Sequence, residues 1–93
     1  MTNNDFLVLC QCDLSAQALR ADTLKYSALN LKMTVGSFRM LMRGLETEDA
    51  KERLRKVIEI ANNEILVLTD ARLKCGVLQC DTREKISLLE ANS

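Results

Sequence analysis

The four cysteines are the residues whose type and spacing most favour chemistry: Cys10 and Cys12 form a C-x-C pair, and Cys75 and Cys80 form a C-x4-C pair. Four thiolates in a tetrahedral array hold a structural zinc ion and add folding free energy to a small domain. However, C-x-C is less typical of zinc knuckles than longer spacings, and free cysteine commonly packs as a small apolar side chain. We therefore favour packed thiols with no bound cofactor, and keep a zinc site and a redox disulfide as alternatives.

No other set of residues is typical of an active site. The sequence has no histidine, so a cysteine or serine nucleophile would lack its usual base. Glu59 and Glu64 belong to a predicted helix whose other polar groups face water. The sequence contains neither a glycine-rich phosphate loop nor a dinucleotide fingerprint. We expect no enzymatic activity and name no catalytic residue.

The composition indicates one small all-α domain. The chain has 93 residues, of which 47% are apolar and 28% charged, with no proline and three glycines. Good helix formers dominate, and the turn residues that a many-stranded fold needs are scarce. Its 13 cations and 13 anions balance, so nothing attracts the whole chain to nucleic acid or an anionic membrane. The apolar run near the N-terminus is too short to span a bilayer and lacks the cationic region of a signal peptide. We expect a cytoplasmic protein.

Two long helices with a tight connection form the centre of the predicted fold. Asp13 is a suitable N-cap and Gly44 a suitable terminal residue, which together predict a first helix over 14–43. Thr47, followed by acidic residues, predicts a second helix over 48–75. Because the connection is so short, the two helices should lie antiparallel as a hairpin.

The two ends of the chain give weaker signals. Residues 1–5 are polar and predicted to be disordered, and residues 6–12 are a short apolar segment that is either a strand or the start of a helix. Gly76 predicts the end of the second helix, and the capping-box spacing of Asp81–Glu84 predicts a short third helix over 82–91. In such a hairpin, all four cysteines would gather at the pole that holds both chain ends.

A heptad seam runs along each long helix, with apolar residues at alternating steps of three and four. In the first helix its members are Leu24, Ala28, Leu31, Val35, Phe38, Met42 and Leu45. In the second helix they are Leu54, Ile58, Ala61, Ile65 and Leu68, widened by Ala50 and Val57. We expect the two seams to face each other and form the core of the hairpin.

The first long helix carries a second stripe on its opposite side. Its members, again three and four residues apart, are Tyr26, Leu29, Met33, Gly36 and Met40, and Leu19 extends it one heptad back. Exposed apolar patches of this size are unusual on soluble monomers, so something should cover the stripe. The third helix and the N-terminal segment are one candidate, a second copy forming a dimeric four-helix-type bundle is another, and a different protein is the third. We favour a second copy or a different protein over an intrachain cover.

Two further features bear on partners. Gly36 lies in the middle of the second stripe, where it permits close approach of a crossing helix or, alternatively, a kink. Lys25, Lys32 and Arg39 recur every seven residues beside the seam, and a basic stripe of this kind can follow phosphates. Acidic residues are interleaved with the basic residues near the turn, however, so a solvated, self-paired face is the favoured interpretation and nucleic acid is not the expected partner.

Taken together, these patterns indicate a non-enzymatic protein-protein interaction module. We expect a small dimeric regulator or inhibitor that binds a larger protein through the second stripe. A four-cysteine metal-binding or redox sensor is the first alternative, and a nucleic-acid-binding helical dimer is the second.

Overall fold

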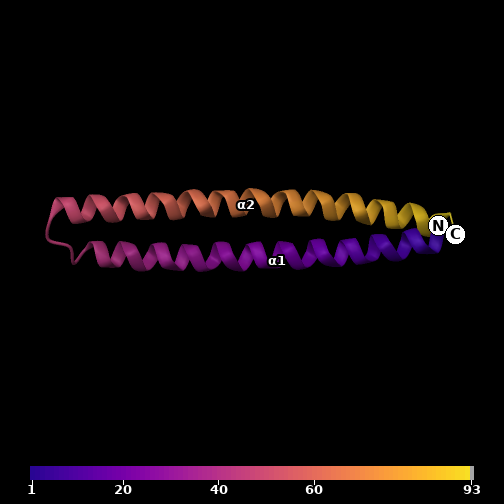
Figure 1. The fold of residues 1–93 in the computed structure, drawn as a ribbon, viewed down its shortest axis with the longest axis horizontal. Coiled ribbons are helices and arrows are strands. Elements are labelled where there is room, and N and C mark those ends of the chain that lie inside the picture. Colours follow the sequence, from indigo (N-terminus) through magenta and orange to yellow (C-terminus); the bar gives the residue numbers. More distant parts are fainter. Residues whose placement is uncertain (93) are drawn as a thin grey trace.

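The computed structural model describes residues 1–92 and consists of two helices, α1 (Asn3–Met42) and α2 (Glu48–Ala91). The helices lie antiparallel along their whole length, so both chain ends meet at one pole and the turn forms the other (Figure 1). The resulting rod measures 69 × 17 × 14 Å. The predicted all-α class and the antiparallel hairpin of two long helices are confirmed.

The first helix begins much earlier than predicted. Thr2, rather than Asp13, is its N-cap: the Thr2 hydroxyl accepts a hydrogen bond from the Asp5 backbone N–H at 3.2 Å, and Asp5 Oδ2 accepts one from the Thr2 N–H at 3.1 Å. This reciprocal capping box satisfies two of the backbone donors that a helix start leaves free. The predictions that residues 1–5 are disordered and that the helix begins at 14 are therefore wrong, and residues 6–12 are helical.

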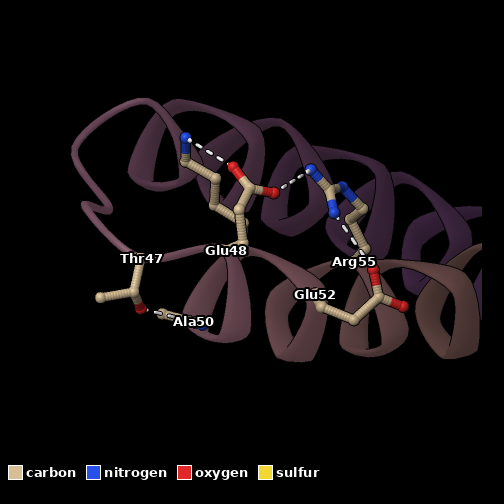
Figure 2. Close-up of polar contacts among 6 residues, drawn as sticks. Thr47, Glu48, Ala50, Glu52 and Arg55 are labelled. Carbon is tan, nitrogen blue, oxygen red and sulfur yellow. Dashed lines mark hydrogen bonds and ion pairs between the residues drawn. The ribbon is translucent and has the colours of Figure 1, made fainter.

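The turn between the helices comprises residues 43–47. Gly44 does not adopt the left-handed conformation expected of a glycine helix terminator, and its N–H instead donates to Leu41 O at 3.0 Å in a right-handed final turn. Thr47 caps α2 as predicted, because its hydroxyl accepts from the Ala50 N–H at 3.2 Å (Figure 2). Glu48 then pairs with Lys51 at 3.4 Å, close to the positive end of the α2 dipole.

The second helix continues without interruption through Gly76 to Ala91. The predicted end at residue 75 and the separate short helix over 82–91 are therefore wrong, since 82–91 is the last part of α2. A glycine inside a helix costs only about 1 kcal/mol relative to alanine. The seam offsets that cost, because its heptad spacing continues on both sides of the glycine, through Cys75, Gln79, Thr82, Ile86 and Leu89.

The seam forms the core, as predicted, and it extends beyond the predicted residues to both ends of the rod. On α1 the additional seam members are Leu7, Cys10, Leu14, Gln17 and Ala21. The core is nevertheless thin: only Ala28, Val35, Ile58, Cys75 and Thr82 are buried, and no side chain within residues 1–92 is completely withdrawn from solvent. A two-helix rod has only one line of contact, so most apolar side chains outside the seam remain exposed.

Candidate protein-binding surfaces

The second stripe is exposed along its whole length. Its five side chains larger than glycine retain between 49% and 70% of their accessible surface. Leu19, Tyr26, Met33 and Met40 recur every seven residues on the side of α1 farthest from α2, and Leu29 and Gly36 lie beside them. The chain ends do not cover the stripe, because both continue as helix along the same rod (Figure 1). The intrachain cover is therefore absent from the described residues.

Gly36 makes no close contact within the chain. A Cβ atom built at this position would meet nothing within 4 Å. No other part of residues 1–92 therefore crosses α1 at the glycine. The helix also continues without a break through the neighbouring weak helix formers, where the Thr34 hydroxyl donates to Asn30 O at 2.9 Å and the Ser37 hydroxyl to Met33 O at 3.2 Å.

The hairpin has a second apolar surface that the sequence patterns did not single out. In heptad notation the seam occupies positions a and d, and the residue preceding each a position belongs to the g column. On α1 this column is Phe6, Asp13, Arg20, Ser27, Thr34 and Leu41; on α2 it is Ala50, Val57, Glu64, Ala71, Leu78 and Lys85. In an antiparallel pair, the two g columns lie on the same broad side of the rod, which we call the g face.

Three shallow hollows confirm that residues of both g columns share this side. They are lined by Leu41 with Ala50, by Arg20 with Ala71 and Leu78, and by Phe6 with Lys85. Phe6, Leu41, Val57 and Leu78 are all exposed on this side, and Ile60 and Val67 extend the apolar surface at its rim. One sequence feature does indicate this face: Val57 lies beside the α2 seam and widens its apolar stripe toward the g face.

The opposite broad side, the e face, is dominated by charge. Lys25 and Lys32 lie beside Arg72 around one hollow, next to apolar seam residues. Arg72 occupies a seam position but is exposed, which suits a long side chain with an apolar stem and a charged end. Nearer the turn, Arg55 contacts Glu52 at 3.1 Å and Glu48 at 3.8 Å (Figure 2). Charged and hydrated groups disfavour burial of this side in an apolar interface.

The four cysteines do not gather at one pole, which overturns the predicted arrangement for a zinc site. Gln17 faces Thr82 across the seam. Cys10 lies seven residues from Gln17 toward the chain ends, and Cys75 lies seven residues from Thr82 toward the turn. At 1.5 Å per residue, these two thiols are therefore about 20 Å apart along the rod.

The remaining two thiols do not complete a metal site within residues 1–92. Cys12 and Cys80 are exposed outside the seam, and all four cysteines are free. No group of three or more potential metal-ligating side chains occurs within residues 1–92. The arrangement differs from the predicted one because α2 does not end at Cys75. This thiol therefore lies near the middle of the rod instead of at its pole.

Comparison with known proteins gives no family for the chain. It matches no family model, no curated protein and no solved structure. Neither helix, over residues 1–92, combines the length and apolar character needed to span a bilayer. The function is therefore inferred from the surfaces of the hairpin itself.

Proposed function

We propose that this chain is a non-enzymatic protein-protein interaction module, a small cytoplasmic regulator or inhibitor that forms a homodimer and binds a larger protein. The observation that supports this proposal is the excess of exposed surface. The hairpin exposes 7017 Å², whereas a compact monomer of its mass exposes about 5,400 Å². Its radius of gyration is 20.7 Å, against about 12 Å for a globular domain of this length.

The second stripe supports a role in binding a different protein. It extends from Leu19 to Met40, a length of about 30 Å at the helical rise. Tyrosine is enriched among the residues that dominate binding energy at interfaces. Methionine is flexible and polarizable, so Met33 and Met40 suit a surface that adapts to a partner. An apolar helix face of this kind binds a partner by lying in a hydrophobic groove.

The test is a pair of lysine substitutions in the stripe, Met33→Lys with Met40→Lys. Both side chains are exposed, so the variant should retain its helical circular dichroism. Partner proteins are first captured with the wild-type chain, and each is then purified and shown to bind that chain again. The variant should fail to bind these proteins. The matched control is Asn63→Lys with Ser87→Lys, which adds the same charge at exposed positions on the outer side of α2 and should bind like the wild type.

The outcome that contradicts this proposal is loss of helicity in the stripe variant at concentrations where the control remains folded. Such a result would mean that the stripe contributes to the core of the folded chain. Light scattering on the wild-type chain, measured first, gives the oligomeric state against which both variants are compared.

A further inference from the structure

We propose that the g face is the surface on which two copies of this chain associate, packed face to face with their turns at opposite poles. This inference builds on the proposed interaction function and names one of its partners, a second copy. It also separates the two apolar surfaces: the g face serves self-association, and the second stripe, on the outer side of α1, remains open to a different protein.

The order of residues in the α2 g column fits a twofold axis. Reading along the helix toward the chain ends, the last four members are Glu64, Ala71, Leu78 and Lys85. An axis between Ala71 and Leu78 places Glu64 opposite the partner's Lys85 and Ala71 opposite the partner's Leu78. Each copy contributes both halves of every contact, as a twofold interface requires. A small residue thus faces a large one, and an anion faces a cation.

The α1 g column has a compatible order. An axis between Arg20 and Ser27 places Phe6 opposite the partner's Leu41. It also places each charged residue of the column opposite a small hydroxyl side chain, Asp13 opposite the partner's Thr34 and Arg20 opposite the partner's Ser27. Apolar residues therefore meet at both ends of the column, and no like charges meet within it.

A single axis serves both columns. The midpoint of the α1 column lies between Arg20 and Ser27, and that of the α2 column lies between Ala71 and Leu78. The hollow that Leu24 and Ala28 share with Arg72 and Leu68 gives the level of the two helices, and by this register the two midpoints differ by about two residues, or 3 Å. Two columns read from different helices therefore give nearly the same position for the axis.

The ionic groups that would pair are without partners inside the chain. Neither Glu64 nor Lys85 forms an ion pair with any residue of the described part of the chain, and both are exposed. They lie on one helix, too far apart to reach each other. The cation nearest the axis at the rim, Lys74, is already paired with Asp70 at 3.0 Å, which reduces its repulsion from the partner's Lys74.

Three hydroxyl groups on this side, one in the g column and two at its rim, already donate hydrogen bonds within α1. The Thr34 hydroxyl donates to Asn30 O at 2.9 Å, the Thr23 hydroxyl to Leu19 O at 3.0 Å, and the Ser37 hydroxyl to Met33 O at 3.2 Å. Since these donors are satisfied within α1, withdrawing them from water in an interface leaves none of them unpaired.

The available area is sufficient for a stable dimer. A side of 69 by 17 Å has a projected area of about 1,200 Å², compared with roughly 800 Å² per partner in a standard protein-protein interface. Covering one such side on each copy would also remove a large part of the excess surface that the single hairpin exposes.

A charge-reversal cycle tests the arrangement. Glu64→Lys and Lys85→Glu, made singly and together, are compared with the wild-type chain by sedimentation equilibrium at low salt. Each single variant creates two like-charge contacts per dimer and should raise the dimer Kd by about tenfold or more, whereas the double variant should return to within about threefold of wild type. The control pair, Glu59→Lys and Arg83→Glu, makes the same changes of charge at exposed positions of α2 away from the g face and should leave the Kd unchanged.

Three results would overturn the inference, and they separate it from the proposed function. If the dimer Kd of Lys85→Glu were restored by Asp13→Lys and not by Glu64→Lys, Lys85 would face Asp13 of the partner copy. The two turns would then lie at the same pole. If the charge reversals left the dimer Kd unchanged but Met33→Lys with Met40→Lys dissociated the dimer, the second stripe would be the self-association surface. The proposed interaction function would not be affected. A folded wild-type chain that stays monomeric at every concentration would overturn both the g-face dimer and the homodimer in the proposed function.

Discussion

The two halves of the seam differ in chemistry although they share one geometry. The half near the turn is apolar throughout, with Leu31, Val35, Phe38, Leu54 and Ile58 at successive contact positions. The half near the chain ends contains Gln17, Gln79 and Thr82 at equivalent positions. Apolar burial is strong but non-directional, whereas a buried polar pair is satisfied in only one alignment. The comparison indicates that the turn half supplies cohesion and the terminal half specifies how the helices align.

The polar pair shows how alignment is specified. Gln17 Nε2 donates to Thr82 Oγ1 at 3.3 Å. The Thr82 hydroxyl is also within reach of the amide oxygen, and can donate to Gln17 Oε1 at 3.4 Å. Thr82 is only 5% exposed and is the one buried polar residue in the described chain. Sliding one helix by a heptad would separate Gln17 from Thr82 and leave the buried Thr82 hydroxyl without this partner, although the Gln17 amide would keep its bond to Asp13 Oδ2 at 3.2 Å within α1. A single polar position commonly fixes register in helical pairs in this way, at some cost in stability.

The largest effect should come from the turn half. Ile58→Ala removes a side chain that is 8% exposed at the centre of the apolar seam, and it should lower the free energy of unfolding by about 2–3 kcal/mol. Urea denaturation at matched chain concentration measures the change. Leu66→Ala, at a position that is 68% exposed, is the control and should change stability by less than about 0.5 kcal/mol. Equal losses from the two variants would contradict the assignment of the core to the seam.

An intermediate effect should distinguish the polar pair from ordinary packing. Gln17→Leu should cost about 1–2 kcal/mol, because it deprives the buried Thr82 hydroxyl of its partner. Adding Thr82→Val should recover this loss, since replacing both partners by apolar groups is close to neutral. The double variant should nevertheless show additional amide resonances in nuclear magnetic resonance spectra, from helices that align in more than one register. A double variant with one sharp set of resonances would show that the apolar seam alone fixes the alignment.

A smaller difference is expected between the two N-caps. Thr47→Ala removes the cap at the turn and should cost about 1 kcal/mol in thermal unfolding. Thr2→Ala should cost less, because the helix can fray by one turn at the chain end without disturbing the core. Thr69→Ala is the control: its hydroxyl donates to Ile65 O within α2, and alanine is a better helix former, so no loss is expected. An equal loss at both caps would contradict the expectation that the chain end can fray by one turn without disturbing the core.

The smallest effects concern one glycine in each half. A Cβ at Gly36 or Gly76 meets nothing within 4 Å, so Gly36→Ala and Gly76→Ala should each stabilise the hairpin by about 0.5–1 kcal/mol. The two variants should differ in binding, because only Gly36 belongs to the second stripe. A helix that crosses there would tolerate alanine poorly, so partner capture should weaken for Gly36→Ala and stay unchanged for Gly76→Ala. Identical partner capture by the two variants would mean that no helix crosses α1 at Gly36.

The same contrast explains what the sequence predicted and what it did not. The class, the hairpin and the turn-half seam followed from a regular apolar spacing together with the Thr47 cap. For the terminal half, the sequence predicts a short apolar segment and a third helix, because polar residues at seam positions hide the heptad and because Gly76 and Asp81 resemble helix boundaries. Local signals of this kind were outweighed by contacts between residues distant in sequence, such as Gln17 and Thr82, which periodicity within one helix does not reveal.

Of the two candidate surfaces, the sequence predicted one and not the other. The second stripe was visible because its members follow a helical period on one helix. The g face was not, because it combines columns from two helices, and its definition requires the register that pairs them. The predicted cysteine cluster failed for the same reason: the location of four thiols depended on where α2 ends.

The turn also sets the order in which the rod comes apart. Facing positions near residues 43–47 are separated by few residues, whereas Gln17 and Thr82 are separated by 65, and closing a longer loop costs more entropy. Formation of the hairpin should therefore start at the turn and proceed toward the chain ends, and transient opening should follow the reverse path. Amide hydrogens near the chain ends should exchange with solvent first, and the polar pair, which lies farther from the ends, should open after the seam contacts beyond it.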